Sequence, residues 1–315
     1  MSPPSRDEFQ IDWICALPVE AAAAQEMLDE NFGILHEQSA TDPNIYTLGQ
    51  IGKHNIAIAC LPAGQYGATA AAITSLKVGL LVGVGGGIPS AEHDVRLGDV
   101  VISCPTGTCG GVVRYDMGKR GNTFKRTGSL NSPPRSLLVA VNSMRTAAMT
   151  DEGRYLEYIQ GATMRNQRTQ KTFGRPGRKT DRLFKAAHEH PSDATDCTMC
   201  PFEWEEVRIA RGDDDPQAHY GIIASGNSVM RDANARDRIG SETGAWCVEM
   251  EASGLMLDFP CIVIRGICDY SDSHKNKEWQ GYAALVAAAY TKELLQWLPQ
   301  SQIKRERLMA HICRR

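Results

Sequence analysis

Short apolar runs alternate with helix-forming stretches over the first hundred residues, and this alternation restricts the fold more than any other feature of the chain. Residues 10–17 and 79–84 predict buried strands, while residues 19–32 and 66–78 are rich in helix formers. Pro18 suits the first turn of a helix, where its missing N–H is not needed. Strands that alternate with helices in this way predict an α/β fold, with a mainly parallel or mixed sheet covered by helices.

The middle of the chain departs from this alternation. Residues 150–217 lack steady periodicity and contain clusters of Gly, Pro and charged residues. This composition predicts an irregular basic insertion on a single domain that spans residues 1–315. Regular structure is expected to return after the insertion, as strands at 219–225 and 260–269, a strand end passing into a helix at 248–258, and a helix at 278–297.

The charge balance and the lack of long apolar segments exclude several kinds of partner. The formal net charge is -3, so no overall positive field attracts nucleic acid or an anionic membrane. No apolar run approaches the ~20 residues that cross a bilayer, and the polar N-terminus has no signal-peptide pattern. Ten cysteines in such a chain are expected to be reduced, which favours a cytoplasmic protein. We therefore expect no nucleic-acid partner and no membrane partner.

A run of glycines follows the strand predicted at 79–84. The segment Gly83-Val84-Gly85-Gly86-Gly87 does not continue as a dinucleotide-binding fingerprint, because position 88 is Ile and Pro89 follows it. Backbone without Cβ atoms lets a flat or sugar-like ligand approach closely, so Gly85 and Gly86 are candidate ligand-binding residues. A tight turn without any ligand is the alternative interpretation.

Acidic residues stand where two later apolar segments end. Glu249, Met250 and Glu251 lie between a strand-like segment and a helix, and a carboxylate there can accept hydrogen bonds from both hydroxyls of a ribose. Stabilisation of the helix N-terminus is the alternative role for these acids. Arg265 and Asp269 lie at the end of the next strand, and ligands of open α/β sheets gather beyond the carboxyl ends of strands. The alternative role for Asp269 is a cap of the following turn.

Three separated parts of the chain together resemble one family. They are Cys15–Glu20, Val82–Ile88, and Val248–Ala252 followed by Arg265–Asp269. Their order and spacing are similar to those of the purine and uridine phosphorylase superfamily, above all its methylthioadenosine/S-adenosylhomocysteine nucleosidase branch. Arg265–Ala284 also resembles a fungal subfamily, often found as the N-terminal module of multidomain proteins similar to those of innate immunity. The resemblance implies a three-layer α/β/α fold with a central mixed twisted sheet, and a homo-oligomer in which neighbouring subunits complete the pockets.

The resemblance also implies roles for individual residues. Glu20 would activate the attacking water, Asp269 would protonate or hold the purine at N7, and Glu251 would bind the ribose hydroxyls, with Met250 packed on the sugar. Such a set suits N-glycoside hydrolysis, because an acid helps the purine to leave, carboxylates stabilise an oxocarbenium-like sugar and a base deprotonates water. No cofactor and no metal are expected to take part in this chemistry. The other candidate substrate-binding residues are Gly85, Gly86, Val229, Glu249 and Arg265.

Two positions depart from the pattern of the family. In its nucleosidases an aromatic residue stacks on adenine after a Ser-Gly-Asp run, whereas here Ser225-Gly226-Asn227-Ser228 leads to Val229. The serine that precedes the catalytic aspartate is replaced by Cys268, a weaker hydrogen-bond partner. These departures leave the identity of the purine base open.

The residues after the first strand favour water over phosphate as the nucleophile. Phosphorylases of the superfamily resemble one another in a Gly-Asp-Pro-x-Arg turn that holds phosphate, whereas this chain has Ala16-Leu17-Pro18-Val19-Glu20. A carboxylate repels phosphate, and Val84 replaces the phosphate-binding hydroxyl of the glycine loop. We expect a purine nucleosidase that acts on a small molecule, a nucleoside or nucleotide of the adenosine or ATP type. The alternatives are a purine nucleoside phosphorylase and a non-catalytic nucleoside or nucleotide sensor within a larger immunity-type protein.

The insertion suggests two further hypotheses. Nine basic residues lie between positions 154 and 185, and they can bind phosphates at the 5′ end of the sugar or simply form a solvated surface. His188, His190, Cys197 and Cys200 can in principle form a structural zinc site, since Cys-x-x-Cys supplies half of one, or the histidines can be exposed. The sequence leaves open whether the substrate is 5′-phosphorylated and how many subunits assemble.

Overall fold

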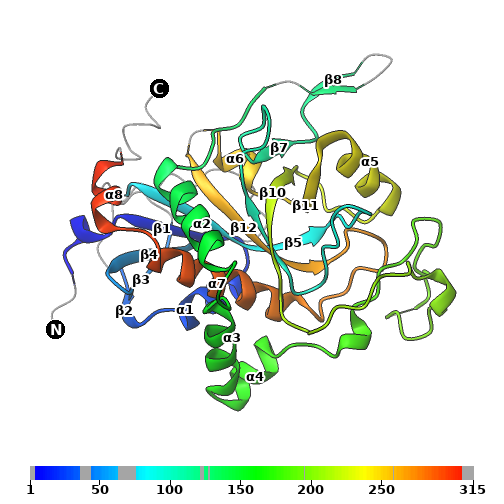
Figure 1. Ribbon diagram of the computed structural model, residues 1–315, viewed down its shortest axis with the longest axis horizontal. Helices are drawn as coiled ribbons and strands as arrows, with labels where there is room; N and C mark the ends of the chain where they lie inside the picture. Colours follow the sequence, from blue (N-terminus) through cyan, green and yellow to red (C-terminus); the bar gives the residue numbers. More distant parts are fainter. Residues whose placement is uncertain are drawn as a thin grey trace.

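The computed structural model describes residues 4–35, 44–62, 76–120, 124–126, 128–194, 196–257 and 259–306. Within them the strands are β1 (Ile11–Cys15), β2 (Glu30–Ile34), β3 (Tyr46–Ile51), β4 (His54–Cys60), β5 (Val78–Gly87), β6 (Val100–Ser103), β7 (Val112–Arg114), β8 (Gly118–Arg120), β9 (Phe124–Arg126), β10 (Ala218–Ser225), β11 (Ala245–Glu249) and β12 (Cys261–Asp269). The α-helices are α1 (Pro18–Glu26), α2 (Arg135–Ala147), α3 (Tyr155–Met164), α4 (Gln167–Phe173), α5 (Ala233–Thr243), α6 (Ala252–Leu255), α7 (Gln280–Gln296) and α8 (Gln300–Arg305). The predicted α/β class is confirmed (Figure 1).

A mixed sheet forms the centre of the molecule, with the strand order β11-β10-β6-β12-β5-β1-β4-β3-β2. β5 runs parallel to both β1 and β12, whereas β6 is antiparallel to β12. β11 pairs with β10 on one side and with the end of β5 on the other. The strands β5, β12, β6, β10 and β11 therefore close into a ring. Such closure requires a strand to bend sharply, and the glycines at the end of β5 permit it.

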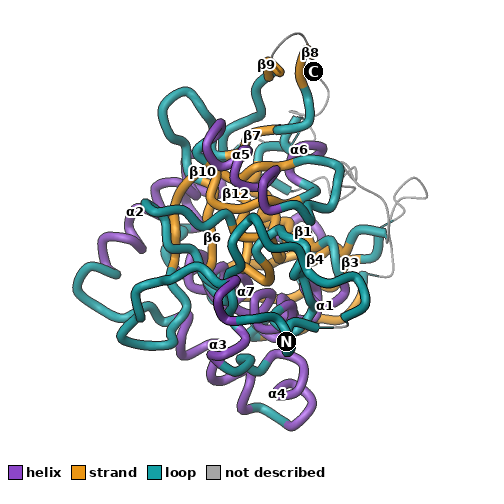
Figure 2. The backbone as a smooth tube through the Cα atoms, turned by 90° about the vertical axis from the view of Figure 1, so that its right-hand side faces the viewer, coloured by secondary structure: helices purple, strands orange, loops and turns teal. Residues whose placement is uncertain are grey.

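Helices pack around this sheet, and α7 has the largest share of the contacts. Its Ala-rich sequence is buried along most of its length, and it packs on β5, β6 and β12. Gly266 of β12 has no room for a side chain, because the carbonyl group of Ala283 in α7 lies against it. α1 packs on β1, β4 and α7, while α2, α3 and α4 contact α7 (Figure 2). α5 contacts β10 and β11 at the closed end of the sheet.

The elements predicted from the sequence differ from the structure at two places, and a third prediction cannot be compared. The helix predicted at 19–32 ends at Glu26, and the mostly exposed edge strand β2 follows it. The segment 150–217 is not irregular throughout, because it begins with α3 and α4, and irregular chain prevails only after Phe173. α3 contacts α7 and buries Ile159 and Ala162. The helix predicted at 66–78 falls mainly on residues 63–75, which lie outside the described residues.

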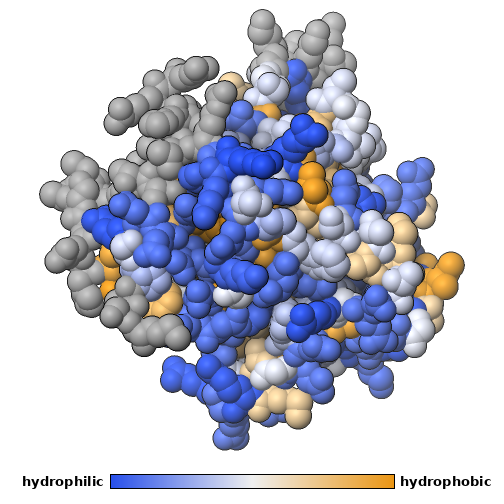
Figure 3. Space-filling model, turned by 60° about the vertical axis from the view of Figure 1, so that its left-hand side comes forward, coloured by the Kyte–Doolittle hydropathy of each residue, from blue (hydrophilic) through white to orange (hydrophobic). Residues whose placement is uncertain are grey.

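Apolar side chains form one large buried cluster that includes residues of β1, β4, β5, β12 and α7. The face shown in Figure 3 is mainly hydrophilic, with hydrophobic side chains in small separate groups. Cysteines of the described residues, from Cys15 to Cys268, are free thiols. None of the helices in the described part of the chain is long and apolar enough to cross a bilayer.

Candidate active site

β5 changes partner near its end, and the site lies where it does so. The pairing of β5 with β1 ends at Leu81, and the last residues of β5 pair with β11 instead. β12 stays beside β5, with Arg265 opposite Gly83 and Asp269 opposite Gly86. The carboxyl ends of strands, at a point where neighbouring strands separate, are the usual position of ligands in α/β sheets.

Gly83 and Gly86 are required by the charged side chains that lie against β5. A Cβ atom on Gly83 would lie 2.5 Å from Nη1 of Arg265 and would also overlap the carboxylate of Glu20. A Cβ atom on Gly86 would lie 2.7 Å from Oδ1 of Asp269. The glycine run therefore lets ionisable groups pack directly on the backbone of β5, which is a more specific role than that of a tight turn.

Glu20 is a buried carboxylate in the first turn of α1 that accepts three backbone N–H groups. Its Oε2 accepts from the N–H groups of Ala16 at 2.7 Å and Leu17 at 2.9 Å, and its Oε1 accepts from Val84 at 2.7 Å. Burial raises the pKa of Glu20, although Arg265 and the three N–H groups oppose the rise. A carboxylate that is held in place and has a raised pKa is suited to accept a proton near neutral pH.

Arg265 is buried at the centre of a group of carboxylates, here called the Arg265 cluster, which consists of Arg265, Glu20, Glu249 and Glu251. Its Nη2 donates to Glu249 Oε2 at 2.5 Å and to Glu251 Oε2 at 2.9 Å, and its Nη1 lies 4.0 Å from Glu20 Oε1. The side chain of Arg265 also packs on Gly85, where an added Cβ would lie 3.2 Å from Cβ of Arg265. The structure thus brings these five predicted site residues together.

In the Arg265 cluster a single cation lies beside three carboxylates, and the pKa values of Glu251 and Arg265 are both raised. Burial, opposed by Arg265 and reinforced by Glu249 and Glu20, raises the pKa of Glu251 to about 7. Although burial opposes it, the carboxylates raise the pKa of Arg265, so the guanidinium stays charged. The cluster can therefore take up or release a proton near neutral pH, and this proton belongs to the interacting carboxylates jointly.

Glu249 and Glu251 have different surroundings although they are close in sequence. Glu249 is turned inward and accepts the N–H groups of Glu251 at 3.1 Å and Ala252 at 3.0 Å, at the start of α6. Its side chain is fully buried, whereas that of Glu251 is 13% exposed and the neighbouring Met250 is half-buried. Glu249 thus has the geometry of a helix cap and an Arg265 partner, and Glu251 is the more accessible of the two acids.

Asp269 ends β12 and lies against Gly86. Its Oδ1 accepts the N–H of Ser271 at 2.9 Å, and its Oδ2 accepts the thiol of Cys268 at 3.2 Å and lies 3.0 Å from Nζ of Lys275. Ser271 has a φ of 55°, a left-handed conformation that costs energy in a residue other than glycine. The sequence analysis did not single out Ser271 or Lys275. An Asp two residues before Ser is a signal for an Asx turn, whereas nothing in the local pattern points to Lys275.

Asp269 also borders a cavity of about 1070 Å³. Cys268 and residues 178–182 of the insertion line the same cavity, which is large enough for a drug-sized ligand. Burial raises the pKa of the Cys268 thiol, and Asp269 and Glu20 raise it further. The Arg265 cluster and Asp269 therefore lie on adjacent parts of one strand-end region, along the glycine run of β5.

Val229 lies apart from these buried groups. It is 51% exposed in the loop that follows β10, at the position where the family's nucleosidases have a stacking aromatic residue. Tyr115 brings an aromatic ring to this loop, since its ring packs on Gly226 and its Oη donates to the carbonyl oxygen of Ser228 at 3.2 Å. Burial raises the pKa of Tyr115, and nearby carboxylates, Glu249 among them, add to the rise. Sequence analysis missed Tyr115 because it is far from the loop along the chain.

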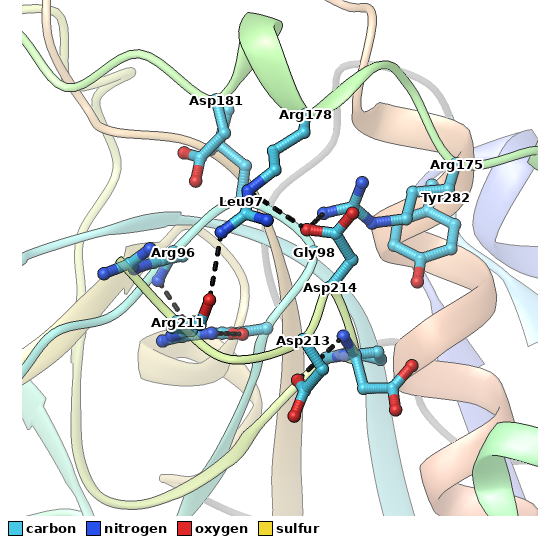
Figure 4. A pocket seen from close by; sticks show the side chains of 13 residues that line it. Arg96, Leu97, Gly98, Arg175, Arg178, Asp181, Arg211, Asp213, Asp214 and Tyr282 are labelled. Atoms are coloured by element: carbon cyan, nitrogen blue, oxygen red, sulfur yellow. Dashed lines mark hydrogen bonds and ion pairs between the residues drawn. The ribbon is translucent and has the colours of Figure 1, made fainter. Parts of the chain in front are cut away.

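Several basic residues of the insertion are paired with acids of the same region. Arg175 and Arg178 lie 3.6 and 3.3 Å from the carboxylate of Asp214, and Figure 4 shows both guanidinium groups directed at it. Arg182 pairs with Glu205 at 2.6 Å. These acids follow the basic stretch in the sequence, so the charge excess seen between residues 154 and 185 is neutralised by later residues. For these three arginines the hypothesis of free phosphate-binding cations therefore loses support.

Comparison with known proteins identifies relatives that cover most of the chain. A nucleotide-binding leucine-rich repeat (NLR)-like protein of Hyaloscypha variabilis is 44% identical over 315 residues, which are 96% of this chain and 31% of that protein. This chain thus spans about a third of the length of that relative. A 5′-methylthioadenosine/S-adenosylhomocysteine nucleosidase of Mycobacterium tuberculosis is 23% identical over 296 residues, 91% of this chain and 95% of that protein. The ATP nucleosidase Cap17 of Escherichia coli is 36% identical over 80 residues, 24% of this chain and 16% of that protein.

Solved structures and a family model agree on the fold. Futalosine hydrolase of Helicobacter pylori has a TM-score of 0.56 at 14% identity and covers 93% of this chain and 99% of its own. The nucleoside phosphorylase-like fold that the sequence resemblance implies is confirmed by this likeness. The model of the phosphorylase superfamily matches residues 13–296. Because this match spans most of the chain and includes the whole Arg265 cluster, the chain belongs to the phosphorylase superfamily.

Proposed function

We propose that this chain is a purine nucleosidase, which hydrolyses the N-glycosidic bond between purine and ribose in a nucleoside or nucleotide of the adenosine or ATP type. The products are the free base and ribose or ribose phosphate. The observation that carries the proposal is Glu20, whose buried carboxylate accepts three backbone N–H groups that would otherwise be free to bind an anion. A carboxylate in this position repels phosphate and can deprotonate water.

In the proposed mechanism the Arg265 cluster acts on the sugar and the attacking water. Glu20 accepts a proton from water as the water attacks the anomeric carbon, and its raised pKa, caused by burial, makes it a stronger base than an exposed glutamate. Arg265 holds Glu251 at 2.9 Å, and the partly exposed carboxylate of Glu251 accepts the ribose hydroxyls. The negative charge of these carboxylates stabilises the oxocarbenium-like sugar of the transition state.

Asp269 acts on the purine at the opposite end of the breaking bond. Its carboxylate is oriented by the N–H of Ser271 and by Lys275, at the end of β12 beside Gly86. Asp269 protonates or holds the purine at N7, so that the base does not have to leave as a free anion. Lys275 forms an ion pair with Asp269 beside the leaving group. No metal or cofactor takes part in this mechanism.

The names of the relatives support the substrate class. One is named for methylthioadenosine and S-adenosylhomocysteine and spans most of this chain, and another is named for ATP and matches 80 residues of it. All three compounds contain adenine on ribose, so adenine is the base we propose. We further propose that the enzyme works in the cytoplasm as a homo-oligomer, at least a dimer, which light scattering at working concentration tests.

Product analysis tests the proposed reaction. The purified chain is incubated with adenosine, guanosine, inosine, AMP and ATP, with and without inorganic phosphate, and the products are separated. We expect adenine together with ribose or its 5′-phosphorylated form, at a rate that phosphate does not change. Asp269→Asn should lower this rate by roughly 10²-fold, because the amide cannot protonate the leaving base. The matched control is Asp237→Asn, since Asp237 is an exposed carboxylate on α5.

Two outcomes would contradict the proposed reaction, and a third would contradict the role of Asp269. Formation of ribose 1-phosphate only in the presence of phosphate would identify a phosphorylase. Tight binding of nucleotide without any product would identify a sensor. Full activity in Asp269→Asn would remove that residue from the mechanism while leaving the reaction itself in place.

A further inference from the structure

Two cysteines and two histidines converge at the edge of the cavity beside Asp269. His190, Cys197 and Cys200 come from the irregular part of the insertion, and His274 comes from the loop between β12 and α7. One ligand atom from each residue lies within 4.8 Å of those of the other three. We propose that these four residues, here called the Cys2His2 cluster, bind one zinc ion that fastens the insertion to the β12–α7 loop. Two thiolates and two imidazoles are a common donor set of structural zinc sites.

The distances around His274 match tetrahedral coordination. Its Nδ1 lies 3.7 Å from Sγ of Cys197 and 3.9 Å from Sγ of Cys200. In a tetrahedral site with Zn–S of ~2.3 Å and Zn–N of ~2.0 Å, a sulfur and a nitrogen ligand are about 3.5 Å apart. The ligand atoms of the two cysteines lie within 4.8 Å of each other. The arrangement therefore needs only small side-chain shifts to hold the ion.

Hydrogen bonds to the ring nitrogens leave lone pairs for a metal. Nε2 of His274 lies 3.0 Å from the carbonyl oxygen of His188, and because a carbonyl only accepts, Nε2 carries the proton and Nδ1 the lone pair. Such a bond to the second ring nitrogen is the usual support of a zinc-bound histidine. The two ring nitrogens of His190 lie 2.9 and 3.0 Å from the carbonyl oxygens of Pro191 and Asp196. A neutral imidazole has one N–H, so one of these nitrogens carries a lone pair, and the ring must turn away from that carbonyl group to bind the ion.

Arg182 and an aromatic ring support the donors from outside. The guanidinium of Arg182 donates to the carbonyl oxygens of Cys197 at 2.5 Å and Cys200 at 2.7 Å, so it fixes the backbone of both cysteines. Phe184 stacks on His274, with ring centroids 3.7 Å apart and an angle of 13° between the planes. These contacts order the donors and shield the thiols, as the surroundings of structural zinc sites do.

The structure changes the donor set that the sequence suggested. His188 is close to the cysteines in sequence, but its ring stacks on Trp204 with centroids 4.9 Å apart, and only its carbonyl group serves the cluster. His274 takes its place from more than seventy residues away. Four protein donors leave no open position for water or substrate, so the role of the ion is structural. It fixes the loop that carries Lys275, the ion-pair partner of Asp269.

Metal analysis of the full chain tests the proposal. The untagged protein is dialysed against metal-free buffer, and elemental analysis is expected to find one zinc ion per chain. Cys200→Ser and His274→Gln should each retain about a tenth of the zinc or less under the same dialysis. His188→Gln is the matched control, because its ring lies outside the cluster, and Cys109→Ser controls for the loss of a thiol outside the cluster. Both controls should keep their zinc in full.

Cobalt substitution of the wild-type chain keeps the proposal testable where a variant fails to fold. Co²⁺ bound to two thiolates in a tetrahedral site gives strong visible d–d bands and a thiolate-to-cobalt charge-transfer band in the near ultraviolet, and one equivalent of Zn²⁺ should abolish both. A chelator should expose residues 174–217 to protease while the sheet and α7 stay intact. Absence of zinc uptake together with absence of the cobalt spectrum would overturn the proposal. So would a Cys197–Cys200 disulfide found by thiol titration, or full zinc content in Cys200→Ser.

Discussion

Two buried clusters of charge in this molecule contain the same kinds of side chain in opposite proportions. In the Arg265 cluster one guanidinium lies beside three carboxylates, at 2.5, 2.9 and 4.0 Å. In the second, here called the Asp99 cluster, one carboxylate receives an arginine and a histidine. Both oxygens of Asp99 accept from Arg211 at 2.7 Å, and one also contacts Nε2 of His219 at 2.8 Å. Carboxylates thus outnumber the guanidinium group in the first cluster but not in the second.

This difference determines what each cluster can do. Burial raises the pKa of Glu251 to about 7 despite its contact with Arg265. Burial also opposes ionisation of Asp99, yet hydrogen bonds from Arg211 and His219 lower its pKa. A carboxylate with a pKa near the working pH can exchange protons with a substrate, whereas one that is always ionised can only hold structure. Burial by itself therefore does not mark a catalytic acid, and the local ratio of cations to carboxylates is the better guide.

The largest effect is expected for Glu20→Gln, measured against Asp99→Asn. Glutamine keeps the size of Glu20 but cannot accept a proton, so kcat/KM for nucleoside hydrolysis should fall by roughly 10²- to 10⁴-fold. Asp99→Asn should leave kcat/KM within about twofold, because the Asp99 cluster takes no part in the chemistry. Steady-state rates and urea unfolding are measured on both variants. Wild-type turnover in Glu20→Gln would show that the Arg265 cluster is no more important for catalysis than the Asp99 cluster.

Arg265→Met removes the only cation of its cluster and should have the largest effect on stability. Three buried carboxylates lose their partner, so the free energy of unfolding should fall by about 3–5 kcal/mol at pH 7. Arg211→Met should cost less, roughly 2 kcal/mol, because Asp99 keeps His219 and two backbone N–H groups. Urea denaturation followed by circular dichroism gives both values. If both variants lost the same free energy of unfolding, the number of carboxylates that contact the arginine would not determine its contribution to stability.

The two clusters should give stability opposite dependences on pH. Glu251 has a folded-state pKa of about 7 against an ordinary value of 4.5, so the folded state binds more protons in that window and loses stability as pH rises through it. Glu20 and Glu249 face Glu251 across Arg265, and the raised pKa of Glu20 acts in the same direction. The folded-state pKa of Asp99 is below its ordinary 3.8, so its contribution is lost as pH falls below that value.

Variants separate these two dependences. Glu251→Gln should remove a stability loss on the order of 3 kcal/mol between pH 5 and pH 8, whereas Asp99→Asn should leave that window unchanged. Asp99→Asn should instead flatten the loss of stability below pH 4. Glu242→Gln is the control, because Glu242 forms an exposed ion pair with Arg126. A Glu251→Gln protein with the wild-type slope between pH 5 and pH 8 would contradict the assignment of the raised pKa.

A strand or helix of this fold could be predicted from the sequence where the residues of that segment alone carry its pattern. Strands β10 and β12 were predicted nearly to the residue, because each is an apolar run that ends at a polar side chain. β5 was predicted at 79–84, but it continues through the glycine run to Gly87. β2 was missed because an exposed edge strand with the sequence ENFGI has no alternating pattern. α3 was missed because its helix depends on packing against α7, which the segment itself does not reveal.

Residues of the candidate site could likewise be predicted only where the signal in the sequence is local. Glu20, Glu251 and Asp269 were singled out because they stand at strand ends and match a family pattern. The inward turn of Glu249 onto Arg265 and α6 was not predictable, because it depends on side-chain geometry between two strands. Lys275 and His274 were missed for a further reason, since each acts on a partner that only the folded chain brings near.

The smallest effect is expected for Arg178→Gln, which tests whether the insertion selects nucleotides by their phosphates. Arg178 lines both the cavity beside Asp269 and a small pocket that it shares with Arg175, and the small pocket, of about 20 Å³, has room for about one water molecule. Both arginines already pair with Asp214 at the small pocket. Four arginines and five aspartates line this pocket, so a phosphate there would meet no net positive charge. The ratio of kcat/KM for ATP to that for adenosine should therefore stay within about twofold of wild type, at low and at high ionic strength. The exposed Arg168, changed to Gln, is the matched control.

A drop of about tenfold in the ratio of kcat/KM for ATP to that for adenosine, equivalent to about 1.4 kcal/mol, would show that Arg178 leaves Asp214 to bind the substrate. This part of the insertion would then belong to the active site and would not be a neutralised surface.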